Sequence, residues 1–578
     1  MWTFFLGGCI EARIEALERD ISGLEREIAA TEVVVEHMKL RMERARNSVV
    51  APRFDNDPVG FNAAAPIPPG DPKRPDVILL SIDTLRADHL GAWGYERPTS
   101  PFLDELAAQG TRFSDTWSPS PWTLPSHTTL LSGQLPSRHG TIEDDLRIRP
   151  TVPLLQESFQ GAGYSTFGVV ATLYVSSKYG FERGFDTFQD FGVLSKELNN
   201  LSSVQADQVF HHALASLQAS EPGKPVFEFL HVYDPHYAYN PVSPWNEKFD
   251  RKPSVGDAVY KNYDEYRKHM IDDEQLAHQI AQYDEEIAFV DEQFRQLVTV
   301  WRASGRSLIV IVTADHGEEF GERGSWGHGH TLFREQLLVP WLVNGPGVKT
   351  QVVGDRVGTE DVAPTLAAFA GVPFEATDGV DRSKTLRSGT PVASSSGRLA
   401  ETSRFDTVRY RLHDGSWELQ LDARLAWRHL CNVAKDPWCK TNLVDGEETR
   451  ANAMTAALVA AVGAPWTVRE AGVIKSGEGG FLYEGGTRHK KNAAVEAGTR
   501  LSILPMDGRV MWASADGSPL KGPWRGLGGP LPGDLDPLIW TGPLVESVEK
   551  TDAETAQLVL LGYQDVDDDD EGLPEGAP

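Results

Sequence analysis

Between Asp76 and about residue 345 the sequence repeats the order strand, loop and helix, and this order restricts the fold to the α/β class. Short apolar runs without polar alternation are typical of strands that are buried on both faces of a parallel sheet. The predicted strands are residues 77–82, 226–230 and 307–312, and the helical stretches between them include residues 101–110 and 279–304. We therefore predict a mostly parallel central sheet flanked by helices, with ligands bound beyond the carboxyl ends of its strands.

The remaining sequence divides into segments of different composition. The chain has 578 residues, which is longer than one domain usually is. Residues 49–75 are rich in Pro, Gly and Ala and are predicted as a linker to the α/β domain, residues 76–462. Residues 463–563 are predicted as a small β domain, because residues 500–504 and 509–512 flank the hairpin signal Asp507-Gly508. The acidic run in residues 564–578 predicts a disordered tail.

Residues 1–48 carry two separate signals. From Ile10 to Met42 apolar residues alternate four and three positions apart, which predicts a coiled coil over residues 10–46 that would join copies of the chain. A single helix packed on the α/β domain is the alternative. Leu6-Gly7-Gly8-Cys9 resembles a bacterial lipobox, although the basic segment is missing and the apolar stretch is short. Either the start lies upstream, which predicts a lipid anchor through Cys9 in the bacterial cell envelope or periplasm, or the match is chance.

Net charge and cysteine count exclude other classes of protein. The formal net charge is -28, so nucleic acid, itself a polyanion, would be repelled rather than bound. Three cysteines are too few for a disulfide framework, and their spacing matches no zinc site. Cys431 and Cys439 either pair or remain two thiols.

Polar residues follow the first and the last predicted strand. Asp83 follows the first strand, and Asp315 with His316 follows the last. Carboxylate and imidazole groups at the tips of neighbouring parallel strands can converge on one cation. Asp83 alone is more typical of a helix N-cap. The combination with Asp315 and His316 favours a metal site.

Between these clusters lies a candidate nucleophile, Thr123. Pro125 suits the first turn of a helix, which places Thr123 just before the helix N-terminus. There the helix dipole and a metal ion would both stabilise an alkoxide. A threonine in this position is usually only a cap, but one that faces a metal cluster is a candidate for nucleophilic catalysis.

Several ordered motifs of residues 76–462 resemble the sulfatase family of the alkaline phosphatase superfamily. The nucleophile motif of that family, Cys or Ser followed by x-Pro-Ser-Arg, corresponds to Thr123-Leu124-Pro125-Ser126-His127. The other matching segments include Asp83-Thr84-Leu85-Arg86-Ala87-Asp88-His89-Leu90-Gly91, His231-Val232-Tyr233-Asp234-Pro235-His236, Ala314-Asp315-His316-Gly317-Glu318 and His328-Gly329. The resemblance implies an alkaline-phosphatase-like fold and hydrolysis of sulfate or phosphate esters.

The resemblance also implies roles for individual residues. The expected metal ligands are Asp83, Thr84, Asp315 and His316, with Thr123 completing the shell as nucleophile. His236 matches the histidine that assists the leaving group or the covalent intermediate. His127 stands where the family has an arginine that fixes the nucleophile and the metal. His328 falls one residue away from the position of the substrate-binding lysine.

The chain departs from the family pattern in three places. Family sulfatases have two adjacent acids after the first strand, whereas here Asp83 is followed by Thr84. Threonine cannot become formylglycine, so Thr123 would form a phospho- or sulfo-threonine ester that water or a second alcohol attacks directly. The Lys-x-His element of the family is not visible in residues 167–174, where Thr172 or Tyr174 is the candidate substitute.

The overall prediction is a metal-dependent sulfatase-like hydrolase that acts on a small-molecule or glycan ester. The resemblance implies Ca²⁺, whereas a single Asp with an Asp-His pair favours Mn²⁺ or Zn²⁺. Two alternatives remain: a phosphotransferase of the same superfamily, and a non-catalytic binding protein on a sulfatase-like scaffold.

Overall fold

The computed structural model describes most of the chain between residues 65 and 462. The described ranges are residues 65–190, 204–250 and 272–462, apart from 238, 376–377, 393–396, 406 and 424, together with the strands between 464 and 505, residue 486 and residues 548 and 550. The predicted coiled coil, the Cys9 anchor and the acidic tail lie outside these residues and stay predictions. Within the described ranges, no helix combines the length and the apolar character needed to cross a membrane.

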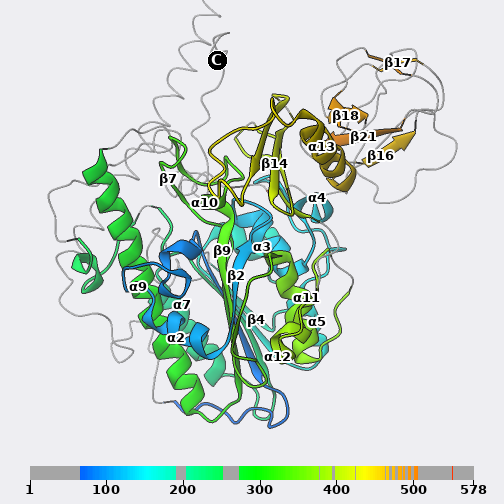
Figure 1. The fold of residues 1–578 in the computed structure, drawn as a ribbon. Coiled ribbons are helices and arrows are strands. Elements are labelled where there is room, and N and C mark those ends of the chain that lie inside the picture. The colour runs from blue at the N-terminus through cyan, green and yellow to red at the C-terminus, as the bar shows by residue number, and fades with distance from the viewer. Residues whose placement is uncertain are drawn as a thin grey trace, which may run out of the picture.

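A nine-stranded sheet forms the centre of the described structure (Figure 1). Its strands are β1 (Asp76–Ile82), β2 (Thr111–Trp117), β3 (Ser165–Val170), β4 (Thr187–Gln189), β5 (Val226–Val232), β6 (Leu308–Ala314), β9 (Leu338–Asn344), β10 (Gln351–Val353) and β11 (Val357–Gly358). The order is β10-β2-β9-β6-β1-β5-β3-β4, and β11 also pairs with β2. Only the pairings of β9 with β2 and with β6 are antiparallel. Every residue of β1, β5 and β6 is buried, which confirms the prediction of a mostly parallel sheet from continuous apolar runs.

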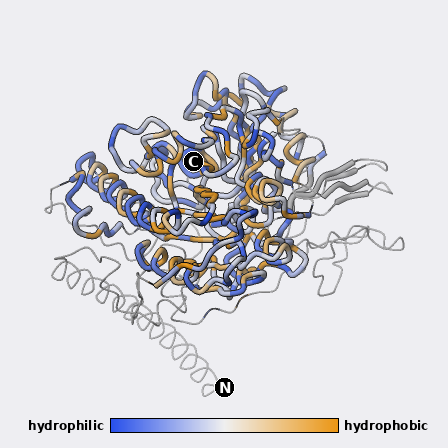
Figure 2. The backbone as a smooth tube through the Cα atoms, turned by 90° about the horizontal axis from the view of Figure 1, so that it is seen from below, coloured by the Kyte–Doolittle hydropathy of each residue, from blue (hydrophilic) through white to orange (hydrophobic). Residues whose placement is uncertain are grey.

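Helices cover both faces of this sheet (Figure 1). One face carries α2 (Pro101–Gln109), α7 (Ala206–Gln218) and α9 (Asp273–Ala303), and the other carries α3 (Thr123–Ser132), α5 (Leu155–Gly161), α11 (Val362–Ala370) and α12 (Ser383–Ser388). Hydrophobic and hydrophilic residues alternate along the helices (Figure 2), as expected where one side of a helix packs on a sheet. Shorter elements are α4 (Pro136–His139), α10 (Arg334–Leu337), β7 (Glu319–Phe320) and β8 (Trp326–Gly327).

A second, antiparallel sheet lies above the carboxyl ends of the central strands (Figure 1). It consists of β12 (Arg398–Thr402), β13 (Arg409–Asp414), β14 (Trp417–Asp422) and β15 (Trp427–Asn432), with α13 (Glu448–Val462) packed against it. Among the hydrogen bonds that join it to the central domain, the Glu401 N–H donates to the Pro119 carbonyl at 2.8 Å, and the Thr402 hydroxyl donates to the Gly329 carbonyl at 3.0 Å. Cys431 and Cys439 form a disulfide, which decides between the two alternatives above.

Beyond α13 the chain forms a separate antiparallel domain (Figure 1). One sheet contains β16 (Ala464–Thr467), β18 (Gly480–Glu484), β19 (Thr487–Arg488) and β21 (Arg500–Pro505), and β17 (Gly472–Ile474) pairs with β20 (Ala493–Val495). The strand predicted at residues 500–504 is therefore present as β21. It pairs with β16 and β18, and its predicted hairpin partner at 509–512 lies outside the described residues.

Candidate active site

Asp83, Asp315 and His316 converge at the carboxyl ends of two neighbouring strands. Asp83 directly follows β1, and Asp315 and His316 follow β6, which pairs with β1 in parallel. One ligand atom from each of the three residues lies within 4.8 Å of the others. All three side chains are buried, with at most 1% exposed. The strand register therefore brings together groups that are more than 230 residues apart in the sequence.

The donor atoms of this cluster fit a divalent cation. His316 Nδ1 lies 3.0 Å from the Gly317 carbonyl, which can only accept, so Nδ1 carries the proton and the Nε2 lone pair faces the cluster. Nε2 lies 3.2 Å from Asp315 Oδ2 and 3.6 Å from Asp83 Oδ1. Asp315 Oδ2 accepts no hydrogen bond from the part of the chain that the structure describes. Burial and the nearby Asp83 carboxylate raise the pKa of Asp315, because a second buried negative charge is unfavourable next to the first. A bound cation would balance the two charges.

Thr123 lies beside this cluster at the start of α3. It is the first residue of the helix, one position later than predicted, and Trp122 occupies the N-cap position without a side-chain capping bond. The Thr123 side chain is fully buried, and its Oγ1 lies 3.4 Å from His316 Nε2. The hydroxyl thus faces the same nitrogen that faces both carboxylates.

His127 holds the first turn of α3 against β1. Its Nδ1 lies 2.8 Å from the Thr123 carbonyl and 3.4 Å from Asp315 Oδ2. Its Nε2 lies 3.0 Å from the hydroxyl of Ser81 in β1. Burial lowers the pKa of His127 well below its ordinary value, so the ring is neutral near pH 7. Ser81 was not singled out from the sequence.

Thr84 makes different contacts from those predicted. Its hydroxyl donates to the Pro235 carbonyl at 3.2 Å, and its backbone N–H donates to Asp315 Oδ1 at 3.3 Å. The backbone turns sharply here, with a φ of 53° at a β-branched residue. The turn directs the hydroxyl to a carbonyl, and the backbone of Thr84 supports Asp315. The role of Thr84 as a metal ligand stays a prediction.

His236 and His328 lie next to the cluster. The ring centroid of His328 lies 4.4 Å from that of His316 and 4.9 Å from that of His236. Burial lowers the pKa of both rings well below the ordinary value. His328 Nδ1 lies 3.0 Å from Glu318 Oε1, and His236 Nδ1 contacts the Tyr237 carbonyl. The structure therefore gathers both predicted histidines in one buried site.

The structure adds His231, to which the sequence motifs assigned no role. Its Nδ1 accepts from the Ala171 N–H at 3.4 Å, which leaves the proton on Nε2, 3.3 Å from Asp83 Oδ2. Burial lowers the pKa of His231 to about 3, so a neutral imidazole lies beside Asp83. The sequence could have suggested His231 only through its position at the end of a predicted strand. The strand order β6-β1-β5 is needed to show that this strand borders Asp83.

Comparison with known proteins shows the family of this chain. A model of the sulfatase family matches residues 75–372, which is more than half of the chain. The chain belongs to the sulfatase family. It is therefore a hydrolase of sulfuric or phosphoric esters, in a family that is generally metal-dependent.

Relatives and solved structures share the sulfatase fold at low identity. The choline-sulfatase of Rhizobium meliloti is 23% identical over 361 residues, which cover 53% of this chain and 70% of that protein. A 2-O GAG sulfatase structure is 21% identical with a TM-score of 0.55 and covers 67% of this chain and 92% of that one. The phosphonate monoester hydrolase of Agrobacterium radiobacter is 18% identical with a TM-score of 0.55, over 65% and 93% of the two chains.

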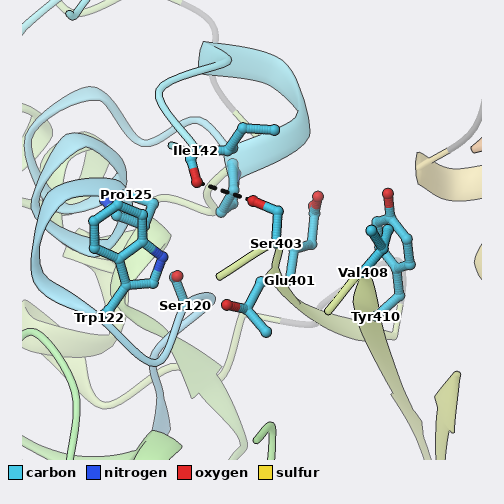
Figure 3. Close-up of a pocket in the computed structure, with 10 residues that line it drawn as sticks. Ser120, Trp122, Pro125, Ile142, Glu401, Ser403, Val408 and Tyr410 are labelled. Carbon is cyan, nitrogen blue, oxygen red and sulfur yellow. Dashed lines mark hydrogen bonds between the residues drawn. The ribbon is translucent and has the colours of Figure 1, made fainter. Parts of the chain in front are cut away.

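A pocket lies between the start of α3 and the second sheet of this sulfatase-family protein (Figure 3). Trp122 and Pro125 contribute from the start of α3. Glu401 and Tyr410 contribute from the second sheet, and Ser403 contributes from the connection between β12 and β13. Ser403 donates to the Ile142 carbonyl at 2.9 Å, and Glu401 accepts from Ser137 at 2.9 Å. Burial raises the pKa of Glu401 to about 7. The second sheet thus reaches the residue next to Thr123.

Proposed function

We propose that this sulfatase-family hydrolase uses Thr123 as its nucleophile and holds a divalent cation with Asp83, Asp315 and His316. One observation carries the proposal: Thr123 Oγ1 lies 3.4 Å from His316 Nε2, the atom that also faces Asp315 at 3.2 Å and Asp83 at 3.6 Å. A packed core has no need for two buried carboxylates, an imidazole and a hydroxyl at one point, because burying unpaired charge is costly.

In the first half of the reaction, Thr123 attacks the ester. Its Oγ forms a bond to sulfur or phosphorus, the bond to the alcohol oxygen breaks, and the hydroxyl proton ends on the released alcohol. When bound, the cation lowers the pKa of the hydroxyl and neutralises charge on the ester oxygens. The start of α3 adds the positive end of the helix dipole on the same side. The product is a sulfo- or phospho-threonine ester.

In the second half, water cleaves that ester, and His236 supports the step as a base. Because His236 Nδ1 contacts the Tyr237 carbonyl, its proton lies on Nδ1 and Nε2 is the acceptor. Burial keeps the ring neutral, as a base requires. A proton passes from water to Nε2, the water oxygen bonds to sulfur or phosphorus, the bond to Thr123 Oγ breaks, and the proton then passes from Nε2 to that Oγ, which restores the hydroxyl and the neutral ring. This assigns His236 to the covalent intermediate rather than to the leaving group.

The donor set also suggests the metal and the substrate. A nitrogen ligand with only two carboxylates suits Mn²⁺ or Zn²⁺ better than Ca²⁺, which prefers six to eight oxygen ligands. The names of similar proteins, choline-sulfatase and 2-O GAG sulfatase, denote a small molecule and a glycan. We therefore propose a small-molecule or glycan ester as the substrate.

The test compares turnover of nitrophenyl sulfate, nitrophenyl phosphate and a bis-nitrophenyl phosphate diester. Each would be assayed with Ca²⁺, Mg²⁺, Mn²⁺ or Zn²⁺ added to metal-stripped protein. Thr123→Ala should lower the rate about 10³-fold or more. Thr128→Ala is the matched control, because Thr128 is a buried threonine of the same helix whose hydroxyl donates to the Leu124 carbonyl.

The proposal also predicts how the Thr123→Ala variant binds the cation. Thr123→Ala should retain cation-dependent thermal stabilisation, because the carboxylates and His316 remain. Full activity in Thr123→Ala would refute the nucleophile assignment. Absence of turnover with every ester and metal would favour the phosphotransferase or the binding-protein alternative.

A further inference from the structure

A buried arginine reaches the active site from the second sheet. Arg404 lies in the connection between β12 and β13 and is only 8% exposed. Its guanidinium carbon lies 4.8 Å from the ring centroid of Trp122, the residue before Thr123. The same carbon lies 4.8 Å from the ring centroid of Phe405. The planar cation is therefore packed against aromatic rings next to the proposed nucleophile.

The backbone around Arg404 is tied to the loop that carries His328. The Thr402 hydroxyl donates to the Gly329 carbonyl at 3.0 Å and accepts from the Arg404 N–H at 3.4 Å. A Cβ at Gly329 would lie 3.2 Å from Arg404 Cδ and 3.7 Å from Nη1. Gly329 also has a φ of 87°. A glycine here thus lets the arginine side chain pass close to the backbone beside His328.

The charge of Arg404 acts on the active-site histidines. After burial, this guanidinium contributes most to lowering the pKa of His328, and it also lowers the pKa of His236. It acts on Tyr174 as well, whose ring packs edge-on against Trp122 at 5.7 Å. The guanidinium group therefore lies beside Trp122 and beside the loop that carries His328.

The site needs such a charge to bind an anionic ester. Asp83 and Asp315 contribute two negative charges, and a divalent cation would balance them. That sum is zero, whereas a sulfate ester carries one negative charge and a phosphate monoester up to two. A desolvated anion requires a compensating cation.

We propose that Arg404 binds the anionic oxygens of the substrate through its guanidinium N–H groups, as a specificity-determining residue contributed by the second sheet. The inference rests on the proposed function, because it takes the ester to lie between Thr123 and Arg404. The fork of N–H donors matches two oxygens of a sulfate or phosphate group.

Binding of inorganic phosphate and inorganic sulfate, measured by titration calorimetry on Mn²⁺-supplied protein, tests this without turnover. Arg404→Gln should weaken phosphate binding roughly 10²-fold, and Arg404→Lys should weaken it less, because it keeps the charge but not the fork. In turnover assays the loss should be larger for the phosphate monoester than for the sulfate ester. Added guanidinium ion should partly restore the activity of Arg404→Ala.

Arg387→Gln is the matched control, because Arg387 also stacks on an aromatic ring, Phe369 at 4.3 Å, but lies in α12 away from the site. It should bind phosphate as the wild type does. Wild-type phosphate affinity in both Arg404→Gln and Arg404→Lys would overturn the inference, even if Thr123→Ala is inactive. An active Thr123→Ala would instead refute the proposed function. If Arg404→Gln does not fold, the calorimetry of Arg404→Lys decides the question.

Discussion

Replacing Asp315 by Asn separates the role of the carboxylate cluster from ordinary packing. Asn has the same shape, and its carbonyl oxygen can still accept from the N–H groups of Thr84 and His316, which donate to Asp315 Oδ1 at 3.3 and 2.9 Å. The substitution therefore removes one buried charge and few other contacts. We expect the variant to be more stable than the wild type in chelator and less stable in saturating Mn²⁺.

The structure gives the size of both effects. Ligand atoms of Asp83 and Asp315 lie within 4.8 Å, so at an effective dielectric constant of about 20 their repulsion amounts to roughly 3 kcal/mol. Without a cation, the folded wild type either bears this repulsion or takes up a proton on Asp315, which also costs free energy. Asp315→Asn removes either cost. A cation at about a thousand times its dissociation constant stabilises the wild type by about 4 kcal/mol. The variant loses most of that gain.

Calorimetric unfolding at pH 8, in chelator and in Mn²⁺, measures both effects. Asp291→Asn is the matched control: Asp291 is also buried and accepts from two backbone N–H groups at the start of α2, but it lies outside the cluster. It should gain as much from Mn²⁺ as the wild type does. The reasoning is refuted if Asp315→Asn is destabilised in chelator and still gains the full stabilisation from Mn²⁺.

Two further predictions concern pH and backbone packing. Burial raises the pKa of Glu401 to about 7, so as pH rises the unfolded chain loses the carboxyl proton before the folded protein does. The free energy of unfolding therefore falls by about 3 kcal/mol as pH rises from about 4.5 to 7. Glu401→Gln should remove this pH dependence, which is checked by measuring the free energy of unfolding at pH 5 and pH 8. An equal pH dependence in the variant and the wild type would contradict the prediction. A Cβ at Gly317 would lie 2.3 Å from the Glu335 carbonyl, so Gly317→Ala should displace His316 and lower turnover about 10-fold or more. Gly354→Ala, with open space around it, is the control for that rate measurement, and an unchanged rate in Gly317→Ala would be evidence against the proposed geometry.

The sequence alone predicted the central strands and the residues of the candidate metal cluster. Continuous apolar runs identified β1, β5 and β6, because a strand covered on both faces needs apolar side chains at every position. The residues directly after β1 and β6 were then natural candidates for a shared cation. Pro125 marked the first turn of α3 and so placed Thr123 at a helix N-terminus to within one residue. Each of these inferences depends on local patterns.

Only the tertiary structure decided which polar groups meet. The strand order puts β5 beside β1 and so brings His231 to Asp83, and the turn at Thr84 sends its hydroxyl to Pro235. The second sheet docks through Thr402 and Gly329, and this contact carries Arg404 to Trp122 from 282 positions along the chain. Local periodicity records whether a side chain faces a core, but it holds no information about the order of strands or the docking of a distant sheet. Those depend on packing between segments that are far apart in the sequence.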